Sequence, residues 1–167
     1  MIGSAVSFTD GGTTYTINNR AGQPLLHEQS PYYYISVTNI DGLRNADISY
    51  ESHPIPNATG EKSGDVFKRG KTIAISGHVY GLNLGKMEEG CDYLGQMFNS
   101  TALRPLSWTR KSDGIAVYMN CRVNQDLTIV ERIEDTSYRW AWLIVLRSDM
   151  PFTYRVSNGS VYPTWQS

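Results

Sequence analysis

The sequence predicts a mainly β protein of the α+β class, a β-sandwich with one packed α-helix and an extended hairpin or loop. Several segments alternate apolar and polar residues with a period of two, which is typical of strands. One segment has apolar residues at helical spacing. A long Pro- and Gly-containing stretch shows neither period and is typical of a loop. Together these patterns predict about six to eight strands and one helix, in the order β-β-loop-β-α-β-β-β.

The first predicted elements lie in residues 32–50. Tyr33, Ile35 and Val37 share one face of a strand over residues 32–40. Asp41-Gly42 then provides a turn, so that residues 46–50 are expected to return as a short second strand of the same hairpin.

Residues 51–70 contain two Pro, three Gly and no sustained period. We interpret them as a long loop, which either becomes ordered on assembly or remains a surface excursion. Residues 71–80 then alternate well, with Ile73, Ile75 and Val79 on one face. Gly77 interrupts this strand and marks a bulge or a close backbone approach.

Asn83 is a suitable N-cap for the predicted helix. The helix is expected to bury one stripe of side chains, and Gly90 and Gly95 are expected on the side away from Met87, where a neighbour could pack closely. The stripe consists of Leu84, Met87, Cys91, Leu94 and Phe98.

Three further strands are predicted over residues 105–109, 115–123 and 139–147. In the last of these, Trp140 and Trp142 face one side while Leu143 faces the other. Because both faces are apolar, this strand is expected to be central in its sheet or covered by partners.

The reactive residues show no catalytic or metal-binding arrangement, so we expect neither an enzyme nor a cofactor. The three histidines have no ligand spacing, and the two cysteines are expected to be reduced core thiols. Four carboxylates are placed in a loop between two strands, where a solvated face is more common than a catalytic pair. These residues are His27, His53, His78, Cys91, Cys121, Asp126, Glu131, Glu134 and Asp135.

The net charge of −1, from 15 basic and 16 acidic residues, argues against a general nucleic-acid binder. No apolar run approaches the ~20 residues that span a bilayer, and the N-terminus has no features of a secretory signal. The aromatic clusters are the positive signal, because they exceed what one small core needs. They cover either a subunit contact or, for the Trp pair, the second face of a sandwich strand. The candidate subunit-interface residues are Tyr32, Tyr34, Phe67, Arg69, Trp140 and Trp142.

Several segments together resemble phage distal tail proteins over residues 35–155. They are Ile40-Asp41-Gly42-Leu43, the strand of residues 69–77, Leu94 and Phe98 followed by Arg104-Pro105-Leu106, and the strand end of residues 143–152. The resemblance implies the N-terminal belt domain of that family, which is similar to tail tube-like domains and carries an extended hairpin. It implies a structural virion protein, assembled in the host cytoplasm, that forms a hexameric ring at the tail tip. The implied partners are the tail tube, the hub and receptor-binding proteins.

The chain departs from the family at Met150, which separates the usual Asp-Pro pair. Family members often continue into a galectin-like domain. We therefore expect one ring-forming domain over residues 1–150, with residues 151–167 as an extension that would begin a missing or truncated second domain. The alternatives are a tail tube or tube-terminator protein and a carbohydrate-binding sandwich that uses Trp108 or Trp165.

Overall fold

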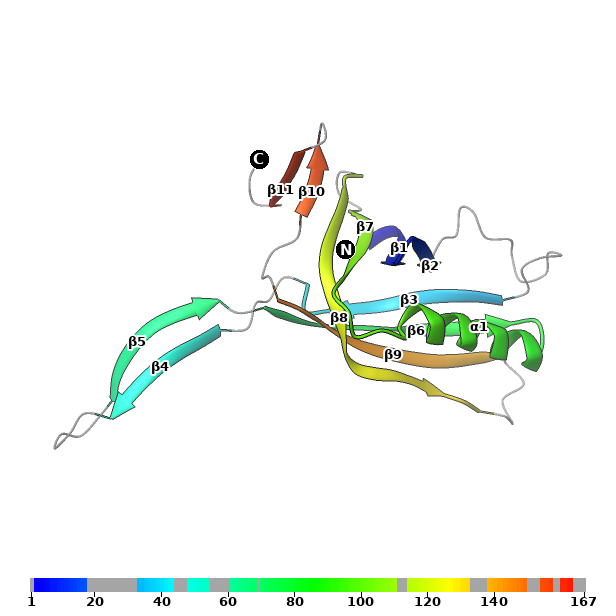
Figure 1. The fold of residues 1–167 in the computed structure, drawn as a ribbon. Helices are drawn as coiled ribbons and strands as arrows, with labels where there is room; N and C mark the ends of the chain where they lie inside the picture. Colours follow the sequence, from blue (N-terminus) through cyan, green and yellow to red (C-terminus); the bar gives the residue numbers. More distant parts are fainter. Residues whose placement is uncertain are drawn as a thin grey trace.

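The computed structural model describes residues 2–17, 33–43, 48–54, 61–68, 70–110, 114–132, 138–149, 154–157 and 160–163. These residues form one helix and eleven strands (Figure 1). In chain order the elements are β1 (Ile2–Asp10), β2 (Thr13–Ile17), β3 (Tyr33–Asp41), β4 (Ile48–Pro54), β5 (Glu61–Lys68), β6 (Lys71–Gly81), α1 (Leu84–Met97), β7 (Arg104–Arg110), β8 (Ala116–Val130), β9 (Arg139–Ser148), β10 (Tyr154–Ser157) and β11 (Ser160–Pro163).

Most strands belong to one antiparallel sheet with the order β2-β1-β7-β8-β9-β6-β3. Strand β8 serves both halves of this sheet. Its first part pairs with β7 as far as Cys121 opposite Arg104, and its second part pairs with β9 from Arg122 onward. The β10–β11 hairpin joins the same sheet through β8. The predicted class, mainly β with a single helix, is confirmed.

Both halves of the sheet and the helix share one hydrophobic core. Phe8 of β1 lies 5.7 Å from Phe98 at the end of α1, and Phe98 lies 6.4 Å from Trp142 of β9, measured between ring centroids. The backbone N–H of Thr16 donates a 2.7 Å hydrogen bond to the hydroxyl of Tyr93. The helix therefore ties the β1–β2 part of the sheet to the β9–β6–β3 part.

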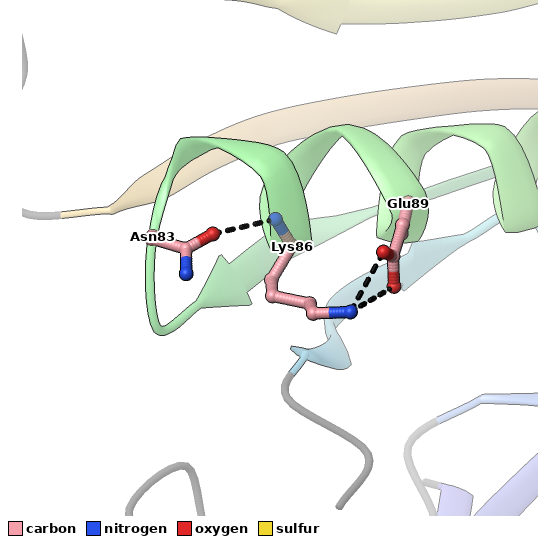
Figure 2. A network of polar contacts seen from close by, with 3 residues as sticks. All are labelled: Asn83, Lys86 and Glu89. Atoms are coloured by element: carbon pink, nitrogen blue, oxygen red, sulfur yellow. Dashed lines mark hydrogen bonds and ion pairs between the residues drawn. The ribbon is translucent and has the colours of Figure 1, made fainter.

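Helix α1 begins as the sequence predicts. The side chain of Asn83 accepts a 3.0 Å hydrogen bond from the backbone N–H of Lys86, and the Lys86 ammonium pairs with Glu89 at 2.7 Å (Figure 2). The predicted stripe is correct except at Leu84, which is 40% exposed. Leu84 is the first helical residue, so it lies at the edge of the core and not within it.

The side of the helix expected for Gly90 was wrong, whereas the close packing expected there is present. Gly90 is buried, and a Cβ atom added to it would lie 2.7 Å from Val79 Cγ1 and 3.2 Å from Tyr33 Cδ2. Three residues is close to one helical turn, so Gly90 shares the buried side with Met87. Gly95 does face open space, with nothing within 4 Å of an added Cβ. The absent side chain at position 90 therefore lets the helix approach β6 and β3.

Replacing Asn83 with alanine is expected to lower the free energy of unfolding by about 1 kcal/mol, because the first turn loses its side-chain cap. Chemical denaturation followed by circular dichroism measures this loss. Asn99→Ala is the matched control: Asn99 is exposed beyond the helix, so its substitution should stay within about 0.5 kcal/mol of the unmodified chain. Equal losses in the two variants would contradict a capping role.

The pairing predicted for the first strands was wrong. Strand β3 pairs with β6, and β4 pairs with β5. The segment interpreted as a long loop, residues 51–70, instead contains the end of β4 and all of β5. The two strands consist mostly of polar residues, so they lack the sustained apolar alternation by which strands are recognised. The extended hairpin implied by the family resemblance is present.

Strands β1 and β2 were not predicted, and β8 continues seven residues past the expected end at Val123 to Val130. Asp126 therefore lies in a strand, and Glu131 directly follows it. Glu134 and Asp135 lie outside the described residues. Strand β9 is central, between β8 and β6, as expected.

Candidate assembly surfaces

The hairpin β4–β5 is the first candidate surface. It forms a two-stranded sheet of its own, with Ile48 opposite Lys68 and Pro54 opposite Glu61, and extends away from the large sheet (Figure 1). An isolated two-stranded hairpin is marginally stable at best in water. Such an element gains from a second surface against which it can pack.

A buried lysine lies where this hairpin leaves the sheet. Lys71, the first residue of β6, is 5% exposed, and its ammonium donates a 2.6 Å hydrogen bond to the carbonyl of Leu43. Burial lowers the pKa of Lys71, and the nearby thiol of Cys121 opposes that change. Since Leu43 follows β3, the bond joins the two chain segments that lead into and out of the hairpin.

The opposite end of β6 carries exposed apolar side chains. Leu82 and Leu84 follow β6 and are 41% and 40% exposed. Tyr138, before β9, is 41% exposed, and its carbonyl accepts a 3.1 Å hydrogen bond from the backbone N–H of Gly81. We call Leu82, Leu84 and Tyr138 the apolar end. It is separated from the hairpin by the length of β6, roughly 33 Å for an extended strand of this length.

Edge strands are the third candidate surface. The sheet order ends at β3 on one side, and the second part of β8 pairs only with β9 among the described strands. The register shifts between Val37 and Asn39 in β3, and twice between Val123 and Thr128 in β8. Edge strands can pair with a neighbouring chain, and irregularities of this kind restrict where such pairing occurs.

The predicted interface aromatics have different positions. Trp140 and Trp142 are each 2% exposed and belong to the core, so their assignment to a subunit contact is corrected. Trp140 donates its ring N–H to the carbonyl of Arg132 at 3.2 Å. The face of β9 that is open is the other one, where Leu143 is 42% exposed.

Tyr34 is half-buried on the outer face, and its ring centroid lies 6.2 Å from that of Tyr80. It stays a candidate. Tyr32, Arg69 and the side chain of Phe67 lie outside the described part of the structure.

The carbohydrate-binding alternative loses one of its two supports. Trp108 is 7% exposed and part of the core, so its ring offers no platform for a sugar. Trp165 lies outside the described residues. Among the described residues, no group of three or more His, Cys, Asp or Glu could hold a metal ion. No described helix is long and apolar enough to cross a membrane.

The two cysteines are free and buried, as predicted. Burial raises the pKa of the Cys121 thiol to about 12, with the Lys71 ammonium opposing the rise. Burial raises the pKa of Cys91 to about 11, and the carboxylates of Glu131, Asp92 and Glu88 add to it. A thiol nucleophile acts as the thiolate, so neither group is prepared for chemistry at neutral pH.

The raised pKa of Cys121 predicts a loss of stability in alkali. From about pH 9 to about pH 12 the unfolded thiol ionises and the buried one stays protonated, so the folded state binds more protons. Below pH 9 the Cys121 thiol makes its full contribution to the free energy of unfolding. Above pH 9 that contribution falls by up to ~1.4 kcal/mol per pH unit. Urea unfolding from pH 9 to 11 should show a shallower decline for Cys121→Ala. Met119→Ala, at an equally buried but non-ionising position, should keep the original slope.

No protein-family profile and no curated protein sequence matches the chain. Among solved structures, the chain is similar to the SPP1 Dit (gp 19.1) protein, described as a paradigm of the hub adsorption apparatus in phages that infect Gram-positive bacteria. The match has a TM-score of 0.58 and 14% sequence identity, and it covers 74% of this chain and 47% of that one. The fold of the chain is therefore similar to that of part of the SPP1 Dit protein. At this identity the similarity concerns the fold, and the matched part is about half of the SPP1 protein.

Proposed function

We propose that this chain is a structural subunit of a phage tail tip, and that its copies form a hexameric ring joining the tail tube to the tip complex. The fold similar to that of SPP1 Dit supports the tail role. The observation that carries the ring is the isolated hairpin β4–β5, which has no described partner strand outside itself. In this proposal neighbouring tail proteins are the partners, and the protein has no enzymatic activity.

The two ends of β6 support a head-to-tail arrangement. The hairpin leaves the sheet at the Lys71 end, and the apolar end follows Gly81 at the other. A ring of identical subunits uses two different patches per subunit, in contacts that close by rotation. Two unlike surfaces at opposite ends of one strand meet that requirement.

Electron microscopy of the purified protein tests the assembly. The expected particle is a closed ring with a mass near six times the 18.7 kDa of one chain. Long tubes would instead favour a tail tube protein. Lone particles at high concentration, alone and with tail tube protein added, would contradict the ring.

A hairpin deletion tests which element makes the contact. Residues 44–69 are replaced by a short Gly-Ser linker between Leu43 and Gly70. The expected result is loss of rings with the circular dichroism spectrum of the large sheet and helix retained. Rings that persist without the hairpin would remove it from the interface.

A further inference from the structure

The hairpin meets the sheet at two pairs of residues, and the two pairs are distant from each other in sequence. The chain leaves the sheet through Gly42 and Leu43 and returns at Gly70 and Lys71. We call these residues the hairpin root. The hydrogen bond from Lys71 Nζ to the Leu43 carbonyl, 2.6 Å long, joins positions 28 residues apart and closes this root.

The root is narrow because glycine allows its strands to touch. Gly42 has φ of +85°, and a Cβ atom there would lie 2.0 Å from the carbonyl oxygen of Thr72. A Cβ atom on Gly70 would lie 1.9 Å from the carbonyl oxygen of Ser148. No side chain fits at such distances, so the end of β3, the start of β6 and the end of β9 are in backbone contact.

Lys71 occupies a position where packing alone would favour an apolar residue. It is on the same face of β6 as the buried Ile73 and Ile75. Taking an ammonium group out of water costs free energy that a hydrogen bond only partly offsets. A methionine of similar length would fill the space without that cost. What the methionine could not do is hold the Leu43 carbonyl.

From this geometry we infer that Lys71 is a positioning residue, whose hydrogen bond to Leu43 fixes the direction in which the β4–β5 hairpin leaves the sheet. The use of that direction in ring assembly rests on the proposed function, whereas the fixed direction itself does not. With the bond in place, the hairpin is presented to a partner in one orientation, which reduces the ordering entropy of association.

Double electron–electron resonance, which measures the distance between two spin labels, tests this inference. One spin label is placed in the hairpin at Ser52→Cys and one on the exposed residue Thr101→Cys, since both native thiols are buried. Labelled chains are diluted with unlabelled ones, so that only distances within one subunit are recorded. The expected result is one narrow distance peak in the parent protein and a peak at least twice as wide in Lys71→Met.

The matched control is Lys86→Met, which removes a lysine of α1 far from the root in sequence and should leave the peak unchanged. If Lys71→Met does not fold, Lys71→Gln replaces it: its amide is polar but too short to reach Leu43. Equal peak widths with and without Lys71, or a broad peak in the parent, would overturn the inference. So would unfolding of both variants, because Lys71 would then serve core stability.

The same samples separate this inference from the ring. A wide peak in Lys71→Met alongside a parent protein that forms no rings would support the positioning role and contradict the proposed assembly. Rings in the parent together with an unchanged peak in Lys71→Met would support the proposed assembly and contradict the positioning role of Lys71.

Discussion

Replacing Trp142 with alanine is expected to lower the free energy of unfolding by about 3–5 kcal/mol. The side chain is 2% exposed and packs against Phe98, so its removal leaves a cavity between β9 and the end of α1. Urea unfolding monitored by circular dichroism measures the loss. The variant also distinguishes the two roles considered for this residue, because an interface residue would weaken assembly and leave the isolated subunit stable.

Leu143→Ala is the neighbouring control. Leu143 follows Trp142 in β9 but faces outward and is 42% exposed, so its truncation should cost less than about 1 kcal/mol. A similar loss of subunit stability in both variants would contradict the inward orientation of the Trp face. A weakened ring in Leu143→Ala alone would identify the outer face as an assembly surface.

Gly77→Ala is expected to cost about 3 kcal/mol or more, because no small displacement can make room for the methyl group. A Cβ atom at this position would lie 1.8 Å from the carbonyl oxygen of Ser36, in the backbone of β3. Gly77 pairs with Val37, where the register of β3 shifts. The close approach that the sequence predicted at Gly77 is therefore present, and alanine would push β3 away from β6.

Gly95→Ala provides the opposite result from the same chemical change. Its added methyl group would meet nothing within 4 Å, and it lies inside α1. It should stabilise the protein by about 0.5–1 kcal/mol through reduced entropy of the unfolded chain. Thermal unfolding of the two variants side by side measures both effects. If Gly77→Ala left the stability unchanged, the backbones of β3 and β6 would have to lie farther apart at Gly77 than they do in the structure.

Strands with one buried face could be predicted from the sequence. The alternation of β6 and β9 follows from the core they share, and α1 shows its stripe for the same reason. The pairing partners could not be predicted, because β3 pairs with β6 across the inserted β4–β5 hairpin. No local sequence pattern indicates that the chain comes back to β3 after this hairpin. Strands β1 and β2 do alternate on either side of the Gly11-Gly12 turn, with Val6 and Phe8 on one face of β1 and Tyr15 and Ile17 on one face of β2, so this hairpin was predictable and was missed.

The candidate surfaces were harder to predict than the fold. In β9 both faces are apolar, and period two cannot say which of them meets the core. The bulky Trp residues suggested a contact with a partner, yet both are buried, and Trp142 packs beside Phe98. Lys71 gave a weaker signal that was available: a lysine continues an otherwise apolar strand face, directly after a glycine.

Strand β8 has a mechanical consequence for the proposed tail assembly. Its 15 residues pair with β7 along the first part and with β9 along the second. Force applied to either half of the sheet therefore passes to the other half along the continuous backbone of β8. It does not have to pass through side-chain contacts between the two halves. Under tension the two halves should yield together, as a single cooperative rupture.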